Sequence, residues 1–284
     1  MKTNMRWKIT DRVLDLSRRA LVMGIVNVTP DSFSDGGLYA NPERAAWHGF
    51  ELESQGADIL DVGGESTRPG ADPVGVDEEL RRVVPVVRQL ARTVKVPISV
   101  DTMKAEVARQ AIEAGAHIIN DVTALRGDPA MAAVAAETGA GVVLMHMIGT
   151  PRTMQQAPVY GDVVAEVAAH LRERMAAAEA AGIDRERIAL DPGIGFGKTL
   201  EHNVEIFRRM GEFIELGRPL LIGPSRKTFI GKLLGDAPPN ERLEGTIAAV
   251  VASICAGARI VRVHDVAPVA KAVKVAQALA PWSR

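Results

Sequence analysis

Polar and ionisable side chains recur at one regular position in this 284-residue sequence, directly after short runs of β-branched and other apolar residues. A single aspartate at such a point is often a helix cap or a turn residue. Eight successive polar endings are harder to explain in that way, because several charges buried together are costly unless they bind a ligand or a metal. The pattern therefore predicts an active site. In chain order its members are Asn27, Asp61, Asp101, Asn120 with Asp121, His146, Asp191, Ser225 to Lys227, and Arg262 with His264.

The apolar runs are predicted strands, and the longer amphipathic segments between them are predicted helices. This alternation is typical of right-handed βαβ units and a parallel sheet. Eight repeats favour a closed (β/α)8 TIM barrel over an open doubly wound sheet, and the carboxyl ends of barrel strands converge on one face. The strands are expected at 21–28, 59–62, 97–100, 117–120, 141–145, 188–190, 219–222 and 259–263. Helices are expected, for example, at 77–93 (with Pro85 as a possible kink), 105–114, 161–181 and 242–256.

No linker or low-complexity tract interrupts this series, so one α/β domain is expected at 19–284. Residues 1–18 are predicted to form a short N-terminal extension or hairpin that packs on the barrel. A hydrophobic content of 47% excludes intrinsic disorder, and a net charge of −1 excludes a generic nucleic-acid coat. The single cysteine, Cys255, excludes an internal disulfide framework and a multi-cysteine zinc site.

No targeting or membrane segment is recognised. The first residues lack the apolar stretch of a signal peptide, and the longest weakly polar run, 247–258, is shorter than the about 20 residues that a membrane span needs. We therefore expect a cytoplasmic protein with no nucleic-acid partner and no membrane partner.

The segment after the first predicted strand, VNVTPDSFSDGG at 26–37, is polar apart from a few residues that include Phe33. Its Pro, Asp, Ser and Gly residues are common in turns, so a plain surface loop is one interpretation. A large aromatic side chain in a polar loop favours a lid that orders over a substrate.

At this point the sequence resembles the dihydropteroate synthase family of pterin-binding enzymes. The resemblance covers all eight predicted strands and leaves out only about the first twenty residues. It implies a transferase of folate biosynthesis that condenses 6-hydroxymethyl-7,8-dihydropterin pyrophosphate with p-aminobenzoate, giving 7,8-dihydropteroate and pyrophosphate, with Mg²⁺ as the cofactor. The matching segments are VNVTPDSFSDGG (26–37), DILDVGGESTRPG (58–70), SVDT (99–102), INDV (119–122), LMHM (144–147), DPGIGFGKT (191–199), SRK (225–227) and RVHD (262–265).

The pterin site implied by the resemblance consists of Asp101, Asn120, Asp191, Phe196 and Lys227. A pterin presents an edge with two parallel N–H donors, which a carboxylate such as Asp191 accepts as a bidentate pair. Asn120 would add an amide contact, and Lys227 would donate to the ring carbonyl and nitrogen. The alternative for Asp191 is a turn residue before Pro192.

The segment that contains Phe196, DPGIGFGKT, ends like a phosphate-binding P-loop. That motif needs glycine where Pro192 stands, so a nucleotide site is not expected. The glycines are instead expected to let the backbone approach the flat pterin ring.

The leaving diphosphate needs cations, and the resemblance assigns Asn27, Thr67, Arg68, Arg262 and His264 to it. Asn27 is the implied direct ligand of Mg²⁺, an ion that takes oxygen ligands and keeps several waters. Arg262 and His264 are two residues apart on one predicted strand, so both should face the barrel interior. The alternative for Arg262 is an ion pair with Asp61 or Asp101, and for Arg68 a solvated loop charge.

The implied p-aminobenzoate pocket is lined by Phe33, Thr67, Arg68, Pro69, Lys227 and Thr228. Thr228 precedes a helix expected near residue 229, where the positive end of the helix dipole attracts a carboxylate. The family most often has serine there, and threonine keeps the hydroxyl group. The alternative is that Thr228 only caps the helix.

The implied mechanism is dissociative. Asp101, Lys227, Arg262 and His264 are its catalytic groups together with Asp35, which would stabilise the cation left on the pterin carbon. No covalent nucleophile is expected, and Cys255 lies far along the sequence from the loop motifs. Sulfonamides, which mimic p-aminobenzoate, are implied inhibitors.

Two other functions predict different sequence features. A methyltetrahydrofolate–corrinoid methyltransferase barrel would have no reason to keep the 28–37 lid, SRK or RVHD. An inactive pterin-binding paralogue should have lost one of its chemical groups, yet all of them are present. The resemblance further implies a homodimer, and the apolar helix at 244–258 is the expected subunit contact.

Overall fold

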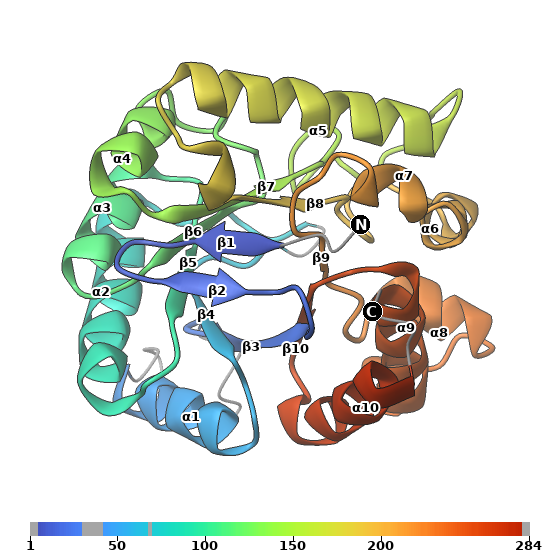
Figure 1. The fold of residues 1–284 in the computed structure, drawn as a ribbon, viewed down its shortest axis with the longest axis horizontal. Coiled ribbons are helices and arrows are strands. Elements are labelled where there is room, and N and C mark those ends of the chain that lie inside the picture. Colours follow the sequence, from blue (N-terminus) through green and yellow to red (C-terminus); the bar gives the residue numbers. More distant parts are fainter. Residues whose placement is uncertain (1–4, 30–41, 68–69, 280–284) are drawn as a thin grey trace.

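The computed structural model describes residues 5–29, 42–67 and 70–279. Its core is a barrel of eight parallel strands, hydrogen-bonded in the order β8-β7-β6-β5-β4-β3-β10-β9. A parallel bridge between Leu190 and Leu220 joins the two end strands and closes the barrel. Helices surround the strands on the outside (Figure 1). The predicted TIM barrel is therefore confirmed.

The boundaries of the strands lie within two residues of the expected ranges, and β7 matches its range at both ends. Strand β4 continues to Gly63, so Asp61 is inside the strand and not at its end. The barrel strands are β3 (Leu21–Asn27), β4 (Ile59–Gly63), β5 (Ile98–Asp101), β6 (Ile118–Asp121), β7 (Gly141–Met145), β8 (Ile188–Asp191), β9 (Leu221–Ile222) and β10 (Ile260–Val263).

Each barrel strand is followed by at least one helix, as the alternation of apolar runs predicts. The second helix runs through Pro85 without ending. None of the helices in the described part of the chain is long and apolar enough to span a membrane. The helices are α1 (Pro42–Ser54), α2 (Val76–Thr93), α3 (Ala105–Glu113), α4 (Met131–Thr138), α5 (Val163–Ala180), α6 (Leu200–Arg208), α7 (Gly211–Ile214), α8 (Thr228–Leu233), α9 (Leu243–Ala256) and α10 (Val266–Leu279), with short 3-10 turns η2 (Arg185–Arg187) and η3 (Pro239–Glu241).

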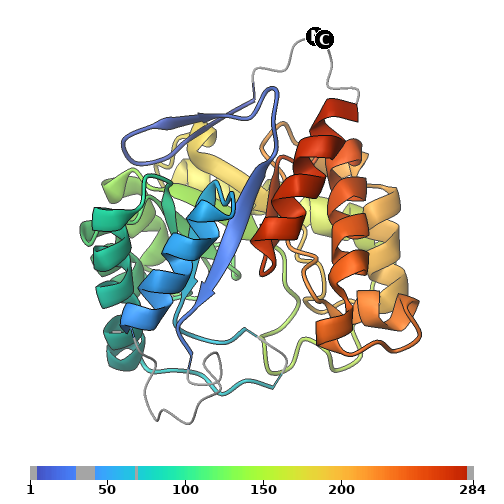
Figure 2. The ribbon, with the colours of Figure 1, turned by 90° about the horizontal axis from the view of Figure 1, so that it is seen from below.

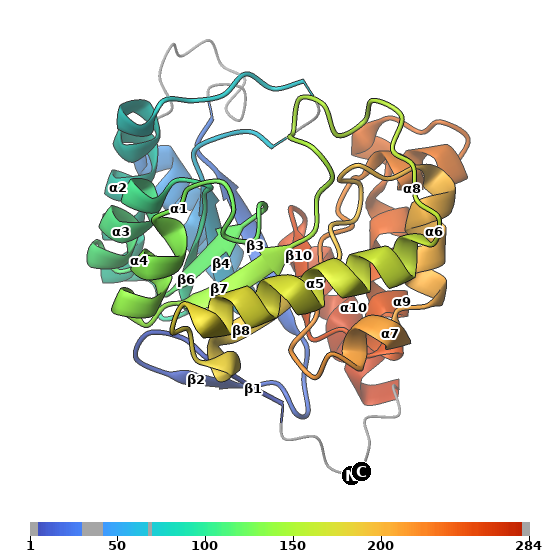
Figure 3. The same cartoon turned by 90° about the horizontal axis from the view of Figure 1, so that it is seen from above.

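A two-stranded antiparallel hairpin precedes the barrel, formed by β1 (Arg6–Lys8) and β2 (Val13–Asp15). Figures 2 and 3 show it across one end of the barrel, with the long loops at the opposite end. Trp7, Ile9 and Leu16 are buried there against the amino-terminal layer of the barrel interior, which includes Leu21 and Ile118. The predicted hairpin is confirmed, and it closes the amino-terminal end with apolar side chains. The division of the chain at residue 18 stays a prediction.

Candidate functional site

A cavity of about 1510 Å³ lies at the carboxyl ends of the barrel strands. The hairpin lies at the other end of the barrel (Figure 3). The barrel brings residues from distant parts of the sequence to the cavity wall. The sequence-predicted residues that line it are Asn27, Thr67, Asp101, Asn120, Asp191, Phe196, Lys227, Thr228, Arg262 and His264. Four other predicted residues, Phe33, Asp35, Arg68 and Pro69, lie outside the described residues.

Arg262 forms two ion pairs inside the barrel. Its Nε donates to Asp61 Oδ2 at 2.6 Å, and its Nη2 donates to Asp101 Oδ2 at 2.7 Å. Asn120 Nδ2 donates to the same Asp61 oxygen at 3.0 Å. The alternative interpretation of Arg262, an ion pair with one of these carboxylates, is thus correct for both. Among the described residues, Asp61 Oδ1 is buried and has no hydrogen-bond partner.

The ionisation of this network is set by burial and by its own charges. Burial raises the pKa of Asp101 to about 7, although the Arg262 guanidinium acts in the opposite direction. Burial disfavours the charge on Arg262, but Asp61 and Asp101 outweigh it and raise the pKa of the guanidinium above its usual range. Arg262 therefore stays charged, while Asp101 can exchange a proton near neutral pH.

Asp191 ends β8, where it forms a turn contact and also faces the cavity. Its Oδ1 accepts the Gly193 N–H at 2.7 Å, as a turn residue does, and the side chain also lines the cavity. Burial raises the pKa of Asp191 to about 6, against the Gly193 N–H bond and the charges of Lys227 and Lys198. The turn fixes one carboxylate oxygen, and the group is ionised at neutral pH.

The loop between β8 and α6 brings its backbone close to the neighbouring strand end. Gly193 has φ +70°, and a Cβ atom there would lie 1.9 Å from the His146 carbonyl oxygen. A side chain therefore cannot replace this glycine without moving the loop. Further on, the Lys227 Nζ lies 4.0 Å from the centre of the Phe196 ring, a cation–π distance.

The loop after β9 is fixed to the end of β10 by two polar contacts. Ser225 Oγ and His264 Nδ1 are 3.0 Å apart. Arg226 forms a bidentate pair with Asp265, with Nε–Oδ2 and Nη2–Oδ1 distances of 2.9 and 2.6 Å. These contacts hold the SRK and RVHD segments together, so Lys227 and Arg262 face one cavity.

The alternative for Thr228, that it only caps the helix, is wrong. Helix α8 begins at Thr228, and its N-cap is Lys227, with extended backbone angles and no side-chain cap. Thr228 therefore occupies the first helical position and does not cap the helix. The hydroxyl group lies on a residue that lines the cavity, as the family resemblance implies.

Sequence reasoning missed two parts of the site. An apolar wall beside the strand ends, of which only Phe196 was predicted, also contains Val122, Met145, Met147 and Met154. Methionine in a strand run looks like ordinary core, so only the matched LMHM segment could have drawn attention to it. The other part is Lys198, which appears in sequence as a loop lysine but is only 4% exposed.

Comparison with known proteins agrees with this geometry. Residues 23–264 match the family model described as "Pterin binding enzyme". The chain is 52% identical to the dihydropteroate synthase of Escherichia coli K12 over 93% of each chain, and 47% identical to that of Synechocystis over 94% and 92%. A Xanthomonas albilineans dihydropteroate synthase solved with 4-aminobenzoic acid superposes with a TM-score of 0.91 at 50% identity, covering 98% of both chains.

Two further solved structures are of dihydropteroate synthases in complex with ligands. The Xanthomonas albilineans enzyme in complex with 7,8-dihydropteroate is 47% identical with a TM-score of 0.87, covering 96% of this chain and 98% of that one. The Yersinia pestis dihydropteroate synthase with a sulfonamide drug is 45% identical with a TM-score of 0.91, at the same coverages.

Proposed function

Since the chain belongs to the dihydropteroate synthase family of pterin-binding enzymes, transferases of folate synthesis, we propose that it joins 6-hydroxymethyl-7,8-dihydropterin pyrophosphate to p-aminobenzoate by a dissociative, Mg²⁺-assisted reaction. The observation that carries this proposal is the cavity. Carboxylates suited to a pterin and cations suited to a diphosphate line the same wall.

Asp191 is the proposed anchor of the pterin. Its ionised carboxylate accepts the two parallel N–H groups of the ring, and Asn120 and Lys227 contact the remaining polar atoms of the pterin edge. The Val122–Met145–Phe196 wall covers the flat apolar surface of the ring. Asp101, which accepts from Arg262 Nη2, is proposed to contact the ring from the Arg262 side.

Arg262 is the proposed principal cation for the leaving diphosphate. Its Nε and Nη2 are engaged with Asp61 and Asp101, and no bond from Nη1 is found among the described residues. That edge is the one offered to a diphosphate oxygen, and His264 on the same strand end offers a second donor. Because the guanidinium is already held by two carboxylates, it needs little reorganisation as negative charge develops on the leaving group.

Magnesium fits the donor set at this end of the cavity. Asn27 ends β3 and lines the cavity with an amide oxygen, a hard neutral ligand of the kind that Mg²⁺ accepts. Diphosphate oxygens and water would complete the shell. When bound, the ion supplies positive charge to the leaving group.

The amine substrate is proposed to lie between Lys227, Thr228 and Thr67 at the outer part of the same cavity. Its carboxylate meets the Lys227 ammonium and the Thr228 hydroxyl. Its amino group then faces the exocyclic pterin carbon after the diphosphate leaves. Phe33, Asp35, Arg68 and Pro69 remain assigned to this pocket by the family resemblance alone.

The direct test is to follow pyrophosphate release with the pterin pyrophosphate, p-aminobenzoate and Mg²⁺, omitting each in turn. Release should need all three, and a sulfonamide should inhibit it. Asn27→Ala and Asp191→Ala should lower the rate by about a hundredfold or more. Full activity of either variant at saturating Mg²⁺ would show that the residue assignment is wrong.

A homodimer is also proposed. Helix α9 exposes the small side chains of Ala248, Ala252 and Cys255 at helical spacing, together with the neighbouring Leu233 and Leu234 of the α8 end. Sedimentation analysis should give twice the chain mass, and Ala252→Glu should shift it toward the monomer. A monomeric parent protein at micromolar concentration would contradict this.

A further inference from the structure

The loop between β8 and α6 has a side-chain donor on each of four successive carbonyls. Such dense pairing is unusual for a loop that also contains three left-handed glycines. The pairs are Gln155 Nε2 to Gly195 O (2.7 Å), Lys198 Nζ to Phe196 O (3.0 Å), Tyr160 Oη to Gly197 O (2.9 Å) and Asn203 Nδ2 to Lys198 O (3.4 Å). The loop therefore has one backbone conformation, set by its neighbours.

Lys198 is the charged member of this set. Its Nζ also lies 3.0 Å from His146 Nδ1, at the end of the adjacent strand β7. Burial lowers the pKa of His146 to about 2, with the Lys198 and His170 charges adding to the effect, so the ring is neutral and accepts at Nδ1. The ammonium thus joins the β8–α6 loop to the neighbouring strand end.

A buried ammonium is expensive to desolvate and is retained only with well-placed partners. The mechanism proposed above gives Lys198 no substrate contact. Its position is informative, because Phe196, whose carbonyl it holds, presents its ring to Lys227, a proposed pterin donor. Moving the Phe196 carbonyl would displace both the ring and the ammonium above it.

We propose that Lys198 is a positioning residue of the pterin pocket, which fixes the Phe196–Lys227 pair by tying the Phe196 carbonyl to His146. This inference rests on the proposed pterin-binding function. It assigns Lys198 mainly to pterin affinity, because Phe196 belongs to the proposed pterin site alone, and the p-aminobenzoate side is affected only through Lys227.

The charges around Lys198 predict a pH signature. Burial lowers the pKa of Lys198 to about 7, with Lys227 acting in the same direction and Asp191 against it. His146 and His170 also face this group, with Arg126 beyond them, and burial lowers the pKa of His170 to about 4. A neutral amine has two N–H groups for the three acceptors His146 Nδ1, His146 O and Phe196 O, and its bonds lose the charge that strengthens them. Pterin affinity should therefore decline as the pH rises above 7.

The experiment compares the parent protein with Lys198→Met and with Lys198→Gln, whose shorter neutral side chain cannot span both partners. Lys271→Met, on the exposed outside of α10, is the matched control. Calorimetry with 6-hydroxymethylpterin gives ring affinity, and steady-state kinetics give KM for each substrate. Circular dichroism and thermal unfolding report whether each variant is folded.

The expected result is a pterin affinity lowered about tenfold to a hundredfold in Lys198→Met, the loss of one charged hydrogen-bond donor. The KM for p-aminobenzoate at saturating pterin should change less than about threefold. The decline above pH 7 should be absent from the variant, and Lys271→Met should match the parent.

Parental pterin affinity in folded Lys198→Met would overturn the proposal, and so would an equal rise in both KM values. If Lys198→Met does not fold, the same criteria apply to Lys198→Gln. A parent protein that fails to bind the pterin would instead reject the proposed function, so the two failures are distinguishable.

Discussion

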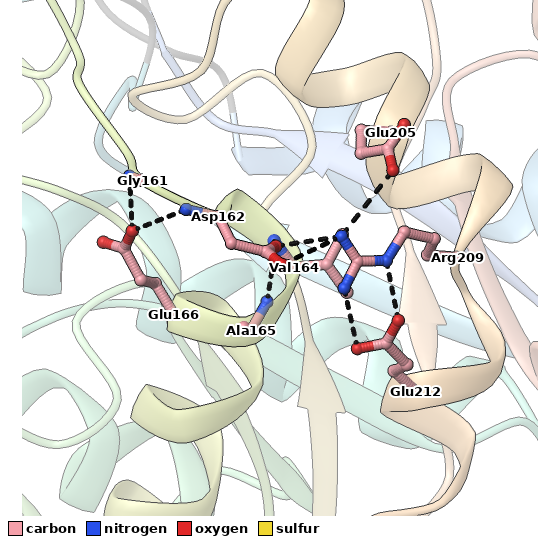
Figure 4. Close-up of polar contacts among 8 residues, drawn as sticks. All are labelled: Gly161, Asp162, Val164, Ala165, Glu166, Glu205, Arg209 and Glu212. Carbon is pink, nitrogen blue, oxygen red and sulfur yellow. Dashed lines mark hydrogen bonds and ion pairs between the residues drawn. The ribbon is translucent and has the colours of Figure 1, made fainter.

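Two arginine-centred ion networks in this protein use the same chemistry in different surroundings. Arg262 lies inside the barrel, with Asp61 0% and Asp101 10% exposed at their side chains. Arg209 lies on the outside, where it joins the start of α5 to α6 and α7 through Asp162, Glu205 and Glu212 (Figure 4). Its partners are 39–45% exposed.

The difference shows what each network can do. Water screens the Arg209 pairs, so they can adjust helix packing but contribute little on their own. Inside the barrel a guanidinium and two carboxylates cannot be separated without leaving a buried charge unpaired. The inner network therefore holds its charges in fixed positions beside the cavity, and the outer network joins neighbouring helices.

The largest effect is expected for Arg262→Met, which removes the centre of the inner network. Pyrophosphate release should fall about a thousandfold, because the proposed leaving-group cation is lost. The free energy of unfolding should fall by about 3–5 kcal/mol at pH 8, since two buried carboxylates lose their partner.

This destabilisation should be smaller at pH 6. The raised pKa of Asp101 rises further without Arg262, so at pH 6 the carboxyl is protonated in the folded state and its unpaired charge disappears. Urea unfolding at both pH values checks this, with Arg209→Met as the matched control. Equal losses at pH 6 and pH 8 would contradict the account.

The next largest effect is expected for the pH dependence of pterin affinity, because the inner and outer carboxylates differ in pKa. Asp191 has its pKa raised to about 6 by burial, whereas the backbone N–H groups of Ala165 and Val164 and the Arg209 charge hold the pKa of Asp162 below its usual range. Asp191 must be ionised to accept two pterin N–H groups, so affinity should fall about tenfold for each pH unit below 6.

Pterin titrations between pH 4.5 and 7 measure this fall in affinity at acid pH. Asp101→Asn should keep it, because Asp191 is intact, and Asp191→Asn should abolish it together with most of the affinity. A fall in affinity that persists in Asp191→Asn would come from another titrating group and would refute its assignment to Asp191.

A smaller effect is expected at Asp162, the N-cap of α5. Its Oδ1 accepts the Val164 and Ala165 N–H groups at 3.0 and 3.1 Å. Asp162→Ala should lower Tm by about 2–4 °C without changing activity. Asp162→Asn keeps the cap but removes the charge, so it should recover most of the loss, and thermal scans of both variants separate the two contributions.

The smallest effect is expected for Arg209→Met, which removes three ion pairs at the surface. Tm should shift by less than about 2 °C, and less still in high salt, with unchanged pyrophosphate release. A shift as large as that of Arg262→Met would remove the distinction between the two networks.

The sequence was sufficient to predict the barrel, because the signals for its strands and helices are local. Short apolar runs such as 141–145 and the helices between them follow from residue type and spacing, and Asp101, Asn120 and Asp191 then converge by topology. Contacts between side chains that lie far apart in the sequence were not predictable. Asp61 looks like a strand-end group in sequence, yet it lies inside β4 and bonds Arg262 and Asn120.

Burial of charge was the other feature that sequence could not supply. Lys198 precedes a threonine in a glycine-rich loop, a context typical of a solvated or phosphate-binding lysine. Its burial depends on His146, which comes 52 residues earlier. Similarly, Lys227 and Thr228 were expected near a helix start, but which of them caps it depends on backbone angles that residue type does not decide.

The hairpin at the closed end has a consequence for how the chain is made. The Trp7 indole N–H donates to the Arg187 carbonyl at 2.8 Å, across 180 residues of sequence. The apolar cluster that contains Trp7 also includes Leu221 and Ile260 from β9 and β10. The ribosome therefore releases the hairpin before the barrel strands, and the burial of its tryptophan is complete only after β10 has emerged. Burial of Trp7 would mark the moment at which the newborn barrel is complete.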